Sequence, residues 1–495
     1  MYTEIYIILA AIWLCSVERR IFMSITGLRP FRPQLHFSAP SMWINDPNGL
    51  VYVNGTYHLF YQYHPFSTVW GPMHWGHAVS KDLVHWEYLP LALAPSEEYD
   101  DYQKGGCFSG SAIEHEGKLY VFYTATANHG NGSEQSQCLA ISEDGINFEK
   151  YDGNPLFDAP EGIQPDSFRD PKVWKHENKY YMVVGASRNN RGLALIYESE
   201  DLYHWNFLNV LAESRGEWGF MWECPDFYQL GDKYVLTFSP MGSGDHTSVY
   251  LTGDFDYKTG KFDWHISGEM DWGFDFYAPQ SMVAPDGRRL IVAWANEWEW
   301  MPLFKDWGPT YQEGWCGFFN VIREVRMCKD GTLAFVPVEE MEKIRENKFT
   351  QREIQITETP QQLKAGDGIS FEMKFTLDLE ETDADRVELK LRCGKEKESR
   401  CIFDLKNGEL LVDRSCADGW SVGTSRSVLK VSEKSLDVHI FSDQSSLEIF
   451  TDQYRNNHSN NIFAGNDQDA ISISAFGGRA VIRDYEAYGL QECFN

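Results

Sequence analysis

The sequence is poor in positive charge. It holds 44 Lys and Arg against 73 Asp and Glu, a formal net charge of −29 at pH 7. Because a surface this acidic repels phosphate backbones and anionic lipid, we expect no nucleic-acid partner and no membrane binding. The charge is compatible with a neutral small-molecule substrate. The simpler interpretation is that the charge only aids solubility.

Paired cysteine motifs are also missing. The chain has 10 Cys, and no two of them form a C-x-x-C pair. An odd number after residue 25, scattered over a long chain, is not a disulfide framework, and nothing predicts a zinc site. One or two disulfides remain compatible with the region of Cys393, Cys401 and Cys416. A histidine-rich stretch shows no paired ligand spacing, so we expect no metal and no cofactor: His58, His64, His74, His77 and His85.

Long hydrophobic runs are absent apart from the uncharged, mostly apolar residues 5–17. This run is shorter than the ~20 residues that span a bilayer and is typical of a signal peptide core, although Glu4 and no Lys or Arg precede it. We predict that residues 1–25 are a signal peptide and that the protein is secreted, with a cytoplasmic location as the alternative. Three glycosylation sequons favour a secreted glycoprotein, at Asn54, Asn131 and Asn457.

What the chain does have is length, aromatic residues and a repeat. Its 495 residues are too many for one ordinary core, so two domains are expected. Within residues 26–340, short polar turns lie between β-type runs, as in hairpins. The turns recur every 53 to 62 residues, at Gly55, Gly117, Asn178, Gly231 and Gly287.

A second repeat is interleaved with the first. The pattern S-x-D-x-x-x-aromatic begins at Ser80, Ser142 and Ser199, where the outer strand of each unit should start. Five copies of a four-strand unit predict a five-bladed β-propeller, since radial repetition protects the strand edges. A long β-sandwich with irregular hairpins is the alternative.

The character of the chain changes after residue 340. Residues 341–350 are charged and predict a linker, and residues 351–495 alternate polar and apolar side chains, as in Ile369–Phe375. This alternation predicts a β-sandwich, so the whole chain is expected to be all-β. The sandwich is expected to pack against the propeller; a sugar-binding role is the alternative.

Three carboxylates in aromatic or proline-bounded segments point to chemistry. They are Asp46 in Trp43-Ile-Asn-Asp-Pro-Asn-Gly49, Asp170 in Phe168-Arg-Asp-Pro171 and Glu223 in Trp222-Glu-Cys-Pro-Asp226. Each precedes the hairpin turn of its unit, near the start of the first strand. Because innermost strands line the channel of a propeller, the three acids should meet at one end of it. Phe108-Ser109-Gly110 and Tyr277-Ala278-Pro279 hold the same place in the other two units.

The neighbours of the acids predict their roles. Donors around Asp46 should favour its ionised form, as a nucleophile requires, and Arg169 should keep Asp170 charged. An apolar shell and the negative Asp226 should favour the protonated form of Glu223, as a general acid requires. Each segment alone is most often a turn or a solvated rim residue; three in register favour a site that cleaves glycosidic bonds. Cys224 has no His or Asn partner nearby, so packing beside the acid is expected of it rather than nucleophilic attack.

Over residues 29–495 the sequence resembles the β-fructofuranosidases (invertases) of glycoside hydrolase family 32. The resemblance rests on several long motifs in order: Arg29–Phe37, Trp43–Gly49, Phe60–Pro65, Trp70–His77, Phe108–Ser111, Phe168–Pro171, Trp222–Cys224 and Ser445–Phe450. The family's fold, a five-bladed propeller followed by a β-sandwich, agrees with the repeat.

The resemblance implies that Asp46 is the nucleophile, Glu223 the general acid/base and Asp170 the transition-state stabiliser. It further implies that the fructose pocket is lined by Trp43, Asn45, Gln62, Trp70, Phe108, Ser109, Arg169 and Trp294. The expected reaction is retaining hydrolysis of terminal β-D-fructofuranosides, above all sucrose, which requires the carboxyls of Asp46 and Glu223 to lie ~5–5.5 Å apart. A fructan exohydrolase, a fructosyltransferase or a non-catalytic sugar-binding protein are the alternatives.

Overall fold

The computed structural model describes residues 30–100, 105–128, 132–244, 246–301 and 305–494. The predicted signal peptide, residues 1–25, lies outside them. Strands dominate, and the few helical turns are of the 3₁₀ type: Glu98–Asp100 (η1), Thr310–Glu313 (η2), Glu339–Ile344 (η3) and Asp452–Tyr454 (η4).

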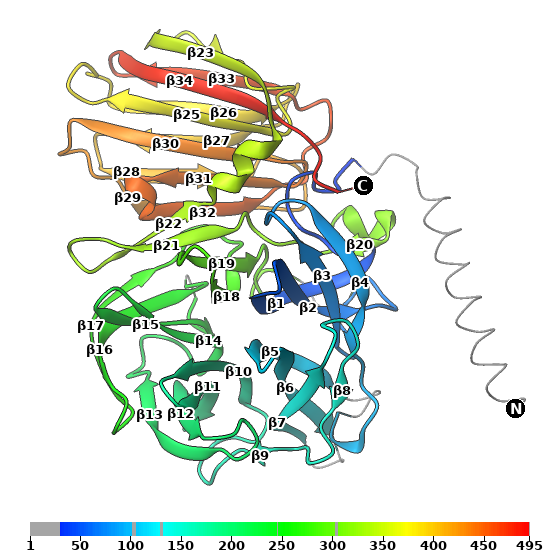
Figure 1. Cartoon of the computed structure of the whole chain (residues 1–495). Coiled ribbons are helices and arrows are strands. Elements are labelled where there is room, and N and C mark those ends of the chain that lie inside the picture. The colour runs from blue at the N-terminus through cyan, green and yellow to red at the C-terminus, as the bar shows by residue number, and fades with distance from the viewer. Residues whose placement is uncertain (1–29, 101–104, 129–131, 245, 302–304, 495) are drawn as a thin grey trace, which may run out of the picture.

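Five sheets form a propeller in the first part of the chain (Figure 1). The first blade contains Met42–Val53 (β1), Thr56–His64 (β2), His74–Ser80 (β3), Trp86–Leu93 (β4) and the late strand Trp315–Cys316 (β20). The second contains Gly106–His115 (β5), Lys118–Asn128 (β6), Ser133–Ser142 (β7), Glu149–Lys150 (β8) and Phe157–Asp158 (β9). The third contains Phe168–His176 (β10), Lys179–Arg188 (β11), Arg191–Ser199 (β12) and Asn206–Glu213 (β13).

Two further blades complete the ring. The fourth contains Met221–Leu230 (β14), Lys233–Met241 (β15), Val249–Asp256 (β16) and Lys261–Glu269 (β17). The fifth contains Tyr277–Val283 (β18), Arg289–Trp294 (β19), Arg323–Met327 (β21) and Leu333–Pro337 (β22). The first strands β1, β5, β10, β14 and β18 contact one another in that order, and β18 contacts β1. The predicted five-bladed propeller is confirmed, with its inner strands around the axis (Figure 1).

Both sequence repeats have the predicted structural meaning. Each polar turn joins the first and second strands of its blade. Each S-x-D pattern ends a third strand and turns toward the fourth. In that turn the Asp side chain accepts two backbone N–H groups, as Asp82 does from Val84 and His85 at 3.2 and 2.9 Å. Asp144 and Asp201 repeat the arrangement. One local capping motif therefore fixes the last turn of three blades.

The five inner strands share an irregularity at their first residues. Pairing with the second strand shifts register within Ile44–Pro47, Phe108–Gly110, Arg169–Lys172, Glu223–Asp226 and Tyr277–Gln280. Such β-bulges re-aim side chains. Backbone φ is positive at Asp170, Cys224 and Ala278, at 69°, 47° and 53°, which costs non-glycine residues about 1–3 kcal/mol each.

A proline follows four of these bulge positions and a glycine the fifth: Pro47, Gly110, Pro171, Pro225 and Pro279. Aligning the strands on that residue gives two sets of equivalent positions. The first set is Asn45, Phe108, Arg169, Glu223 and Tyr277; the second is Asp46, Ser109, Asp170, Cys224 and Ala278. The sequence predicts equivalent positions for the three acids. The structure differs, because Glu223 belongs to the first set and the two aspartates to the second.

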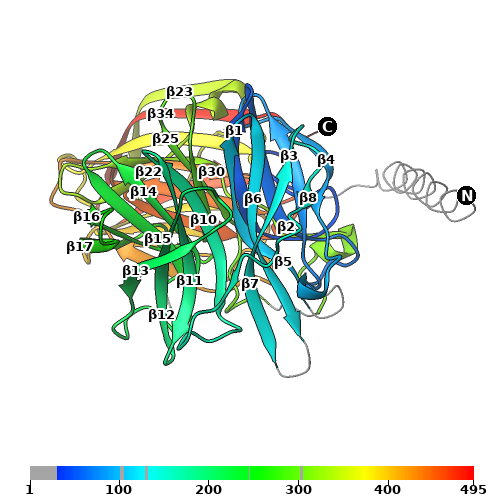
Figure 2. The same cartoon turned by 60° about the horizontal axis from the view of Figure 1, so that its bottom comes forward.

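The C-terminal domain is a sandwich of two six-stranded sheets. One contains Arg345–Ile356 (β23), Ala480–Leu490 (β34), Phe371–Asp378 (β25), Ser435–Ser442 (β30), Ser446–Thr451 (β31) and Asn456–Asn461 (β32). The other contains Gln361–Gln362 (β24), Ala470–Phe476 (β33), Arg386–Cys393 (β26), Ser399–Asp404 (β27), Glu409–Asp413 (β28) and Thr424–Val428 (β29). In the view of Figure 2 the propeller lies in front of the C-terminal strands β23, β25 and β34. The expected linker at 341–350 is shorter than predicted, because η3 occupies its start and β23 begins at Arg345. The charged run there is divided between η3 and the start of the edge strand β23.

Buried charges join the two domains and the segment before β1. Arg323 of the propeller donates to Asp271 at 2.8 Å and to Glu448 of the sandwich at 2.6 Å. His36 lies between Glu448 and Asp443, 2.8 Å from each. Burial alone would lower the pKa of His36, but these carboxylates raise it to about 9. Paired ions thus connect the two domains. Each of these charges would be costly to bury without its partner.

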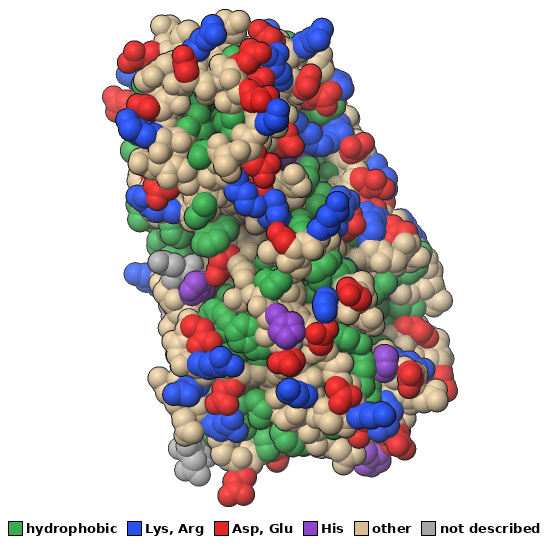
Figure 3. All heavy atoms as spheres, turned by 90° about the vertical axis from the view of Figure 1, so that its left-hand side faces the viewer, with side chains coloured by type: hydrophobic (Ala, Val, Ile, Leu, Met, Phe, Trp, Pro, Cys, Tyr) green, Lys and Arg blue, Asp and Glu red, His purple; other side chains and the backbone are tan. Residues whose placement is uncertain are grey.

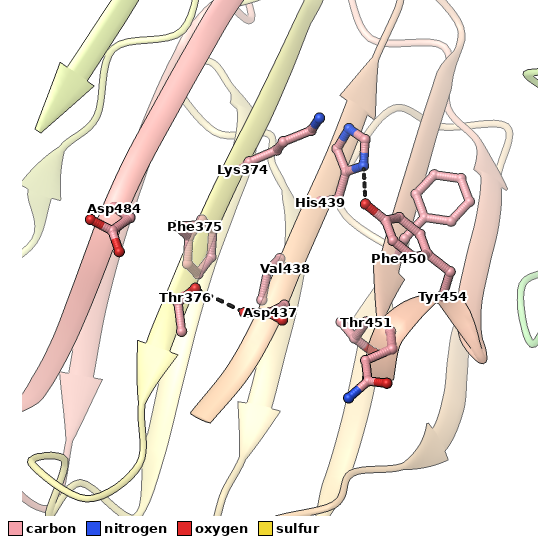
Figure 4. A pocket seen from close by; sticks show the side chains of 11 residues that line it. Lys374, Phe375, Thr376, Asp437, Val438, His439, Phe450, Thr451, Tyr454 and Asp484 are labelled. Carbon is pink, nitrogen blue, oxygen red and sulfur yellow. Dashed lines mark hydrogen bonds between the residues drawn. The ribbon is translucent and has the colours of Figure 1, made fainter. Parts of the chain in front are cut away.

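The surface is otherwise mixed in charge. On the face shown in Figure 3, acidic and basic side chains are interspersed over both domains. The outer face of the β25–β30 sheet holds a groove of about 280 Å³. Two pairs of its polar groups bind each other: Thr376 donates to Asp437 at 2.8 Å, and His439 lies 3.3 Å from the hydroxyl of Tyr454 (Figure 4).

Two expectations tied to secretion are not supported. All nine cysteines in the described residues are unpaired, including Cys393, Cys401 and Cys416, so the suggested disulfides are absent there. Asn457 is 1% exposed within β32, where no glycan fits. Asn54 is exposed in the β1–β2 turn, and Asn131 lies outside the described residues. None of the helices described is both long and apolar enough to cross a membrane.

Candidate active site

The bulged ends of the inner strands open into one cavity of about 280 Å³. Asp46, Asp170 and Glu223 all line it, although they come from three blades. The same cavity is lined by Asn45, Gln62, Trp70, Met73, Phe108, Ser109, Gln135, Asp166, Arg169, Met241 and Trp298. The convergence predicted from the repeat is therefore present in the structure.

The carboxylate of Asp46 is buried and held by three donors. Ser109 Oγ donates to one oxygen at 2.6 Å and Asn45 Nδ2 to the other at 3.0 Å. Cys224 Sγ lies 3.5 Å from the first oxygen. Burial and the negative charge of Glu223 outweigh these donors and raise the pKa of Asp46 to about 6. Asp46 remains ionised at neutral pH. Its negative charge is nevertheless stabilised less than we predicted from the donors around it in the sequence.

Asp170 is fixed through the backbone of the next blade. Its carboxylate accepts the Cys224 N–H at 2.9 Å, and Cys224 Sγ lies 3.6 Å away. The left-handed backbone at Asp170 lets its own N–H donate to Thr124 Oγ1, at 2.9 Å. Burial raises the pKa of Asp170 to about 7 despite the opposing charge of Arg169. Arg169 does favour the charged form of Asp170, as expected, but burial and the negative charges of Glu223 and Asp46 outweigh it.

Arg169 contacts Glu223. Its Nε and one terminal nitrogen donate to Glu223 Oε1 at 3.0 and 2.9 Å, whereas Asp170 lies 4.0 Å from the guanidinium. The hydroxyl of Tyr277 donates to Glu223 Oε2 at 2.5 Å. Asp226, expected beside Glu223, instead accepts from Ser281 N–H at 2.7 Å and pairs with Lys172 at 3.1 Å. Polar groups, not an apolar shell, hold the Glu223 carboxylate.

Six of the eight residues expected in the pocket line the cavity: Asn45, Gln62, Trp70, Phe108, Ser109 and Arg169. Trp43 and Trp294 do not line it, because they are 1% and 0% exposed. They pack instead beneath Trp298, which does line it; Trp43 stacks on Trp298 with centroids 6.4 Å apart and Trp294 lies 4.4 Å away. Trp43 also donates to Asn45 at 2.8 Å, so it orients a pocket residue from below.

Several contributors were missed. Met241 ends the second strand β15 and Trp298 follows the second strand β19; both line the cavity, and no local motif marks them. Gln135 and Asp166 are likewise unmarked, although Gln135 accepts from Arg169 at 3.3 Å. Tyr277 had a usable signal, since Tyr277-Ala-Pro279 occupies in its blade the place of Glu223-Cys-Pro225. Within the described residues, no group of three or more His, Cys, Asp or Glu could hold a metal ion.

Comparisons with known proteins agree with this geometry. Residues 36–337 match the glycosyl hydrolases family 32 N-terminal domain and residues 340–489 the C-terminal domain of that family. The chain therefore belongs to glycoside hydrolase family 32.

Its curated relatives are sugar hydrolases. A sucrose-6-phosphate hydrolase of Zymomonas mobilis is 37% identical over 491 residues, covering 93% of this chain and 92% of the relative. A raffinose invertase of Escherichia coli is 37% identical over 471 residues, covering 91% and 94%. Among solved structures, a family 32 β-fructofuranosidase of Bombyx mori is 32% identical with a TM-score of 0.80, covering 97% and 99%. A variant of that enzyme has been solved with sucrose.

Proposed function

We propose that the protein hydrolyses terminal non-reducing β-D-fructofuranosides, with sucrose as the principal substrate, and retains the anomeric configuration. The observation that carries this proposal is the meeting of Asp46, Asp170 and Glu223 in one cavity walled by Trp70, Phe108 and Trp298. Relatives named for sucrose-6-phosphate hydrolysis and raffinose inversion, and a neighbour solved with sucrose, support the substrate class.

In this mechanism Asp46 attacks the anomeric carbon of the fructosyl unit while Glu223 transfers a proton to the departing oxygen. The covalent fructosyl ester is then attacked by water, and Glu223 takes up the proton that the water loses. Free Asp46, protonated Glu223, fructose and the leaving alcohol result, so the catalyst returns to its starting state. Asp46 suits attack because its Oδ atoms are aligned by Ser109 and Asn45.

Arg169 and Tyr277 fix both oxygens of Glu223. A carboxyl restrained in this way keeps one orientation for both proton transfers. This lowers the entropic cost of reaching the reactive arrangement. Asp170 shares the Cys224 thiol with Asp46 and lies beside the developing positive charge. Its negative form would stabilise that charge and bind fructosyl hydroxyls.

The test is product analysis on sucrose, raffinose, inulin and sucrose 6-phosphate with the wild-type chain and Asp46→Asn. Fructose release from sucrose, lost in Asp46→Asn, is the expected result. Preference for inulin would favour a fructan exohydrolase, and oligomer formation at high sucrose a fructosyltransferase. Unchanged turnover in Asp46→Asn, or binding without any turnover of the wild-type chain, would overturn the proposal.

We propose further that residues 1–25 direct secretion and that Asn54 carries a glycan. The apolar run at 5–17 and the exposed position of Asn54 support this. N-terminal sequencing of the protein from its own host, with a mobility shift after enzymatic deglycosylation, tests both points. A cytoplasmic protein with an intact N-terminus and no shift would contradict them.

A further inference from the structure

We propose that the sandwich domain contains a second carbohydrate site, centred on Trp420, which binds the chain of a neutral fructose oligosaccharide or polysaccharide. The choice of fructan rests on the proposed function; the existence of a sugar site rests on geometry alone. A cavity of about 490 Å³ lies here, formed by the connections around residues 394–397, 418–420 and 463–468 together with Phe31. That volume falls within the range typical of small-molecule sites.

The indole of Trp420 is one of three aromatic side chains that line this cavity, the others being Phe31 and Phe463. It is 45% exposed, and yet it is not loosely placed, because it packs edge-on against Trp307 with centroids 6.2 Å apart. Trp307 in turn packs against Phe463, which also lines the cavity, at 5.7 Å. An exposed indole offers an apolar face to sugar C–H groups and a polar N–H at its edge.

The loop that presents Trp420 is fixed in place. One oxygen of Asp418 accepts the backbone N–H groups of Gly419, Trp420 and Ser421 at 2.6, 2.5 and 2.8 Å. The other accepts the N–H of Phe463 at 2.7 Å. Gln468 bridges two walls by donating to the carbonyls of Arg392 and Ala417 at 3.1 and 2.9 Å. A preformed aromatic surface loses little entropy when a ligand binds.

The rim suits a neutral polyol. Lys395 and Lys397 face the cavity along with Glu396 and Asp467, so both charge signs and both donors and acceptors surround the ring. An anion or a cation would meet repulsion from one pair, whereas hydroxyl groups can donate to the carboxylates and accept from the ammonium groups. The groove in Figure 4 differs, since four of its polar groups are bound to one another in two pairs and its Phe450 is buried.

The site also adjoins the wall of the catalytic cavity. Trp307 packs against Trp300 at 5.2 Å, two residues from Trp298. On the other side, Thr68 donates to Asp306 at 2.9 Å, two residues from Trp70. The segment that holds Asp306 and Trp307 therefore lies between the two cavities. A long substrate bound at Trp420 is held near the mouth of the catalytic cavity. Sucrose is too short to need this second contact.

The experiment uses the full chain with Asp46→Asn, so that no substrate is consumed. Native electrophoresis in gels containing inulin, with fructose added to occupy the catalytic cavity, should retard this protein, and Trp420→Ala should weaken the retardation about tenfold. Val422→Ala is the matched control, because Val422 is 66% exposed two residues away and does not line the cavity. Gels containing dextran should give no retardation.

In the catalytically intact chain, Trp420→Ala should leave kcat/KM for sucrose unchanged and raise KM for inulin several-fold. Equal retardation of Trp420→Ala and its parent would overturn the site, and equal retardation by dextran would overturn its assignment to fructans. The gel assay measures binding and needs no turnover. A protein that binds inulin at Trp420 but hydrolyses no fructoside would therefore refute the proposed function and not the second site.

Discussion

Arg169 is the neighbour of Asp170 in the chain, but it binds Glu223 in the next blade, at 2.9 Å against 4.0 Å to Asp170. Two of its nitrogens converge on a single oxygen of Glu223. The cation therefore serves the acid/base residue, and it does so across the boundary between two blades.

Arg169→Lys tests that contact. A lysine keeps the charge but cannot present two N–H groups in a fixed plane, so Glu223 should lose its alignment. We expect kcat for sucrose to fall roughly 10- to 100-fold, corresponding to the loss of a charge-assisted hydrogen bond of about 1.5–3 kcal/mol. Arg191→Lys, at an exposed position, is the control. Full activity of Arg169→Lys would show that the contact is not needed.

Tyr277→Phe removes the 2.5 Å hydrogen bond to the other oxygen of Glu223. Burial, together with the Glu223 carboxylate, raises the pKa of Tyr277 well above its usual range, so this hydroxyl remains a donor at any working pH. We expect kcat/KM to fall about tenfold or more, with the folded state retained. Steady-state kinetics alongside circular dichroism would check it; a loss confined to folding would contradict the assigned role.

The pH dependence of kcat/KM should report Asp46. Because burial raises its pKa from 3.8 to about 6, the nucleophile becomes protonated as the pH falls through that value. Activity on sucrose should decline tenfold per pH unit below it. A pH–rate profile with substrate well below KM is the measurement, and an acidic limb that begins only below pH 4 would refute the assignment.

The same shift predicts that Asp46 destabilises the fold. The folded state binds the Asp46 proton more tightly than the unfolded chain does, so stability is lost as pH rises from 3.8 through about 6. Asp46→Asn should therefore raise the free energy of unfolding at pH 7 by roughly 2–3 kcal/mol. The gain should vanish below about pH 4. Urea titrations at both pH values test it, and an equal effect at the two would speak against this origin.

Arg414→Met tests the connection between the sandwich and the active-site wall. Arg414 donates to Asp275 at 2.7 Å, and its guanidinium lies over Trp300, 4.6 Å from the ring centroid. Removing it leaves a buried unpaired carboxylate, so we expect destabilisation of about 3–5 kcal/mol, partly relieved in the double variant with Asp275→Asn. Because Trp298 lies on the same loop, KM for sucrose should rise in the variants that fold. Additive effects of the two substitutions would exclude the coupling.

The fold was predictable because it is repeated. Turns such as Val53-Asn54-Gly55 and caps such as Asp82 depend on residues close in sequence. The acids were predictable as a group because each begins an inner strand. Their partners were not, because Arg169–Glu223 and Tyr277–Glu223 each join residues 54 positions apart. Trp43 and Trp294 were misplaced because aromatic content does not distinguish a wall of the cavity from the layer beneath it.

The bulge that begins each inner strand separates the chemistry of the site from the backbone that supports it. Ser109 and Ala278 occupy positions equivalent to Asp46 and Asp170, with similar left-handed backbone at Ala278 and Asp170. Ser109 lines the catalytic cavity, so a different side chain there would face that cavity without a new loop or a new strand. Side chains that line the site can thus change at such a bulge while the residues that specify the strands and turns of the blade stay the same.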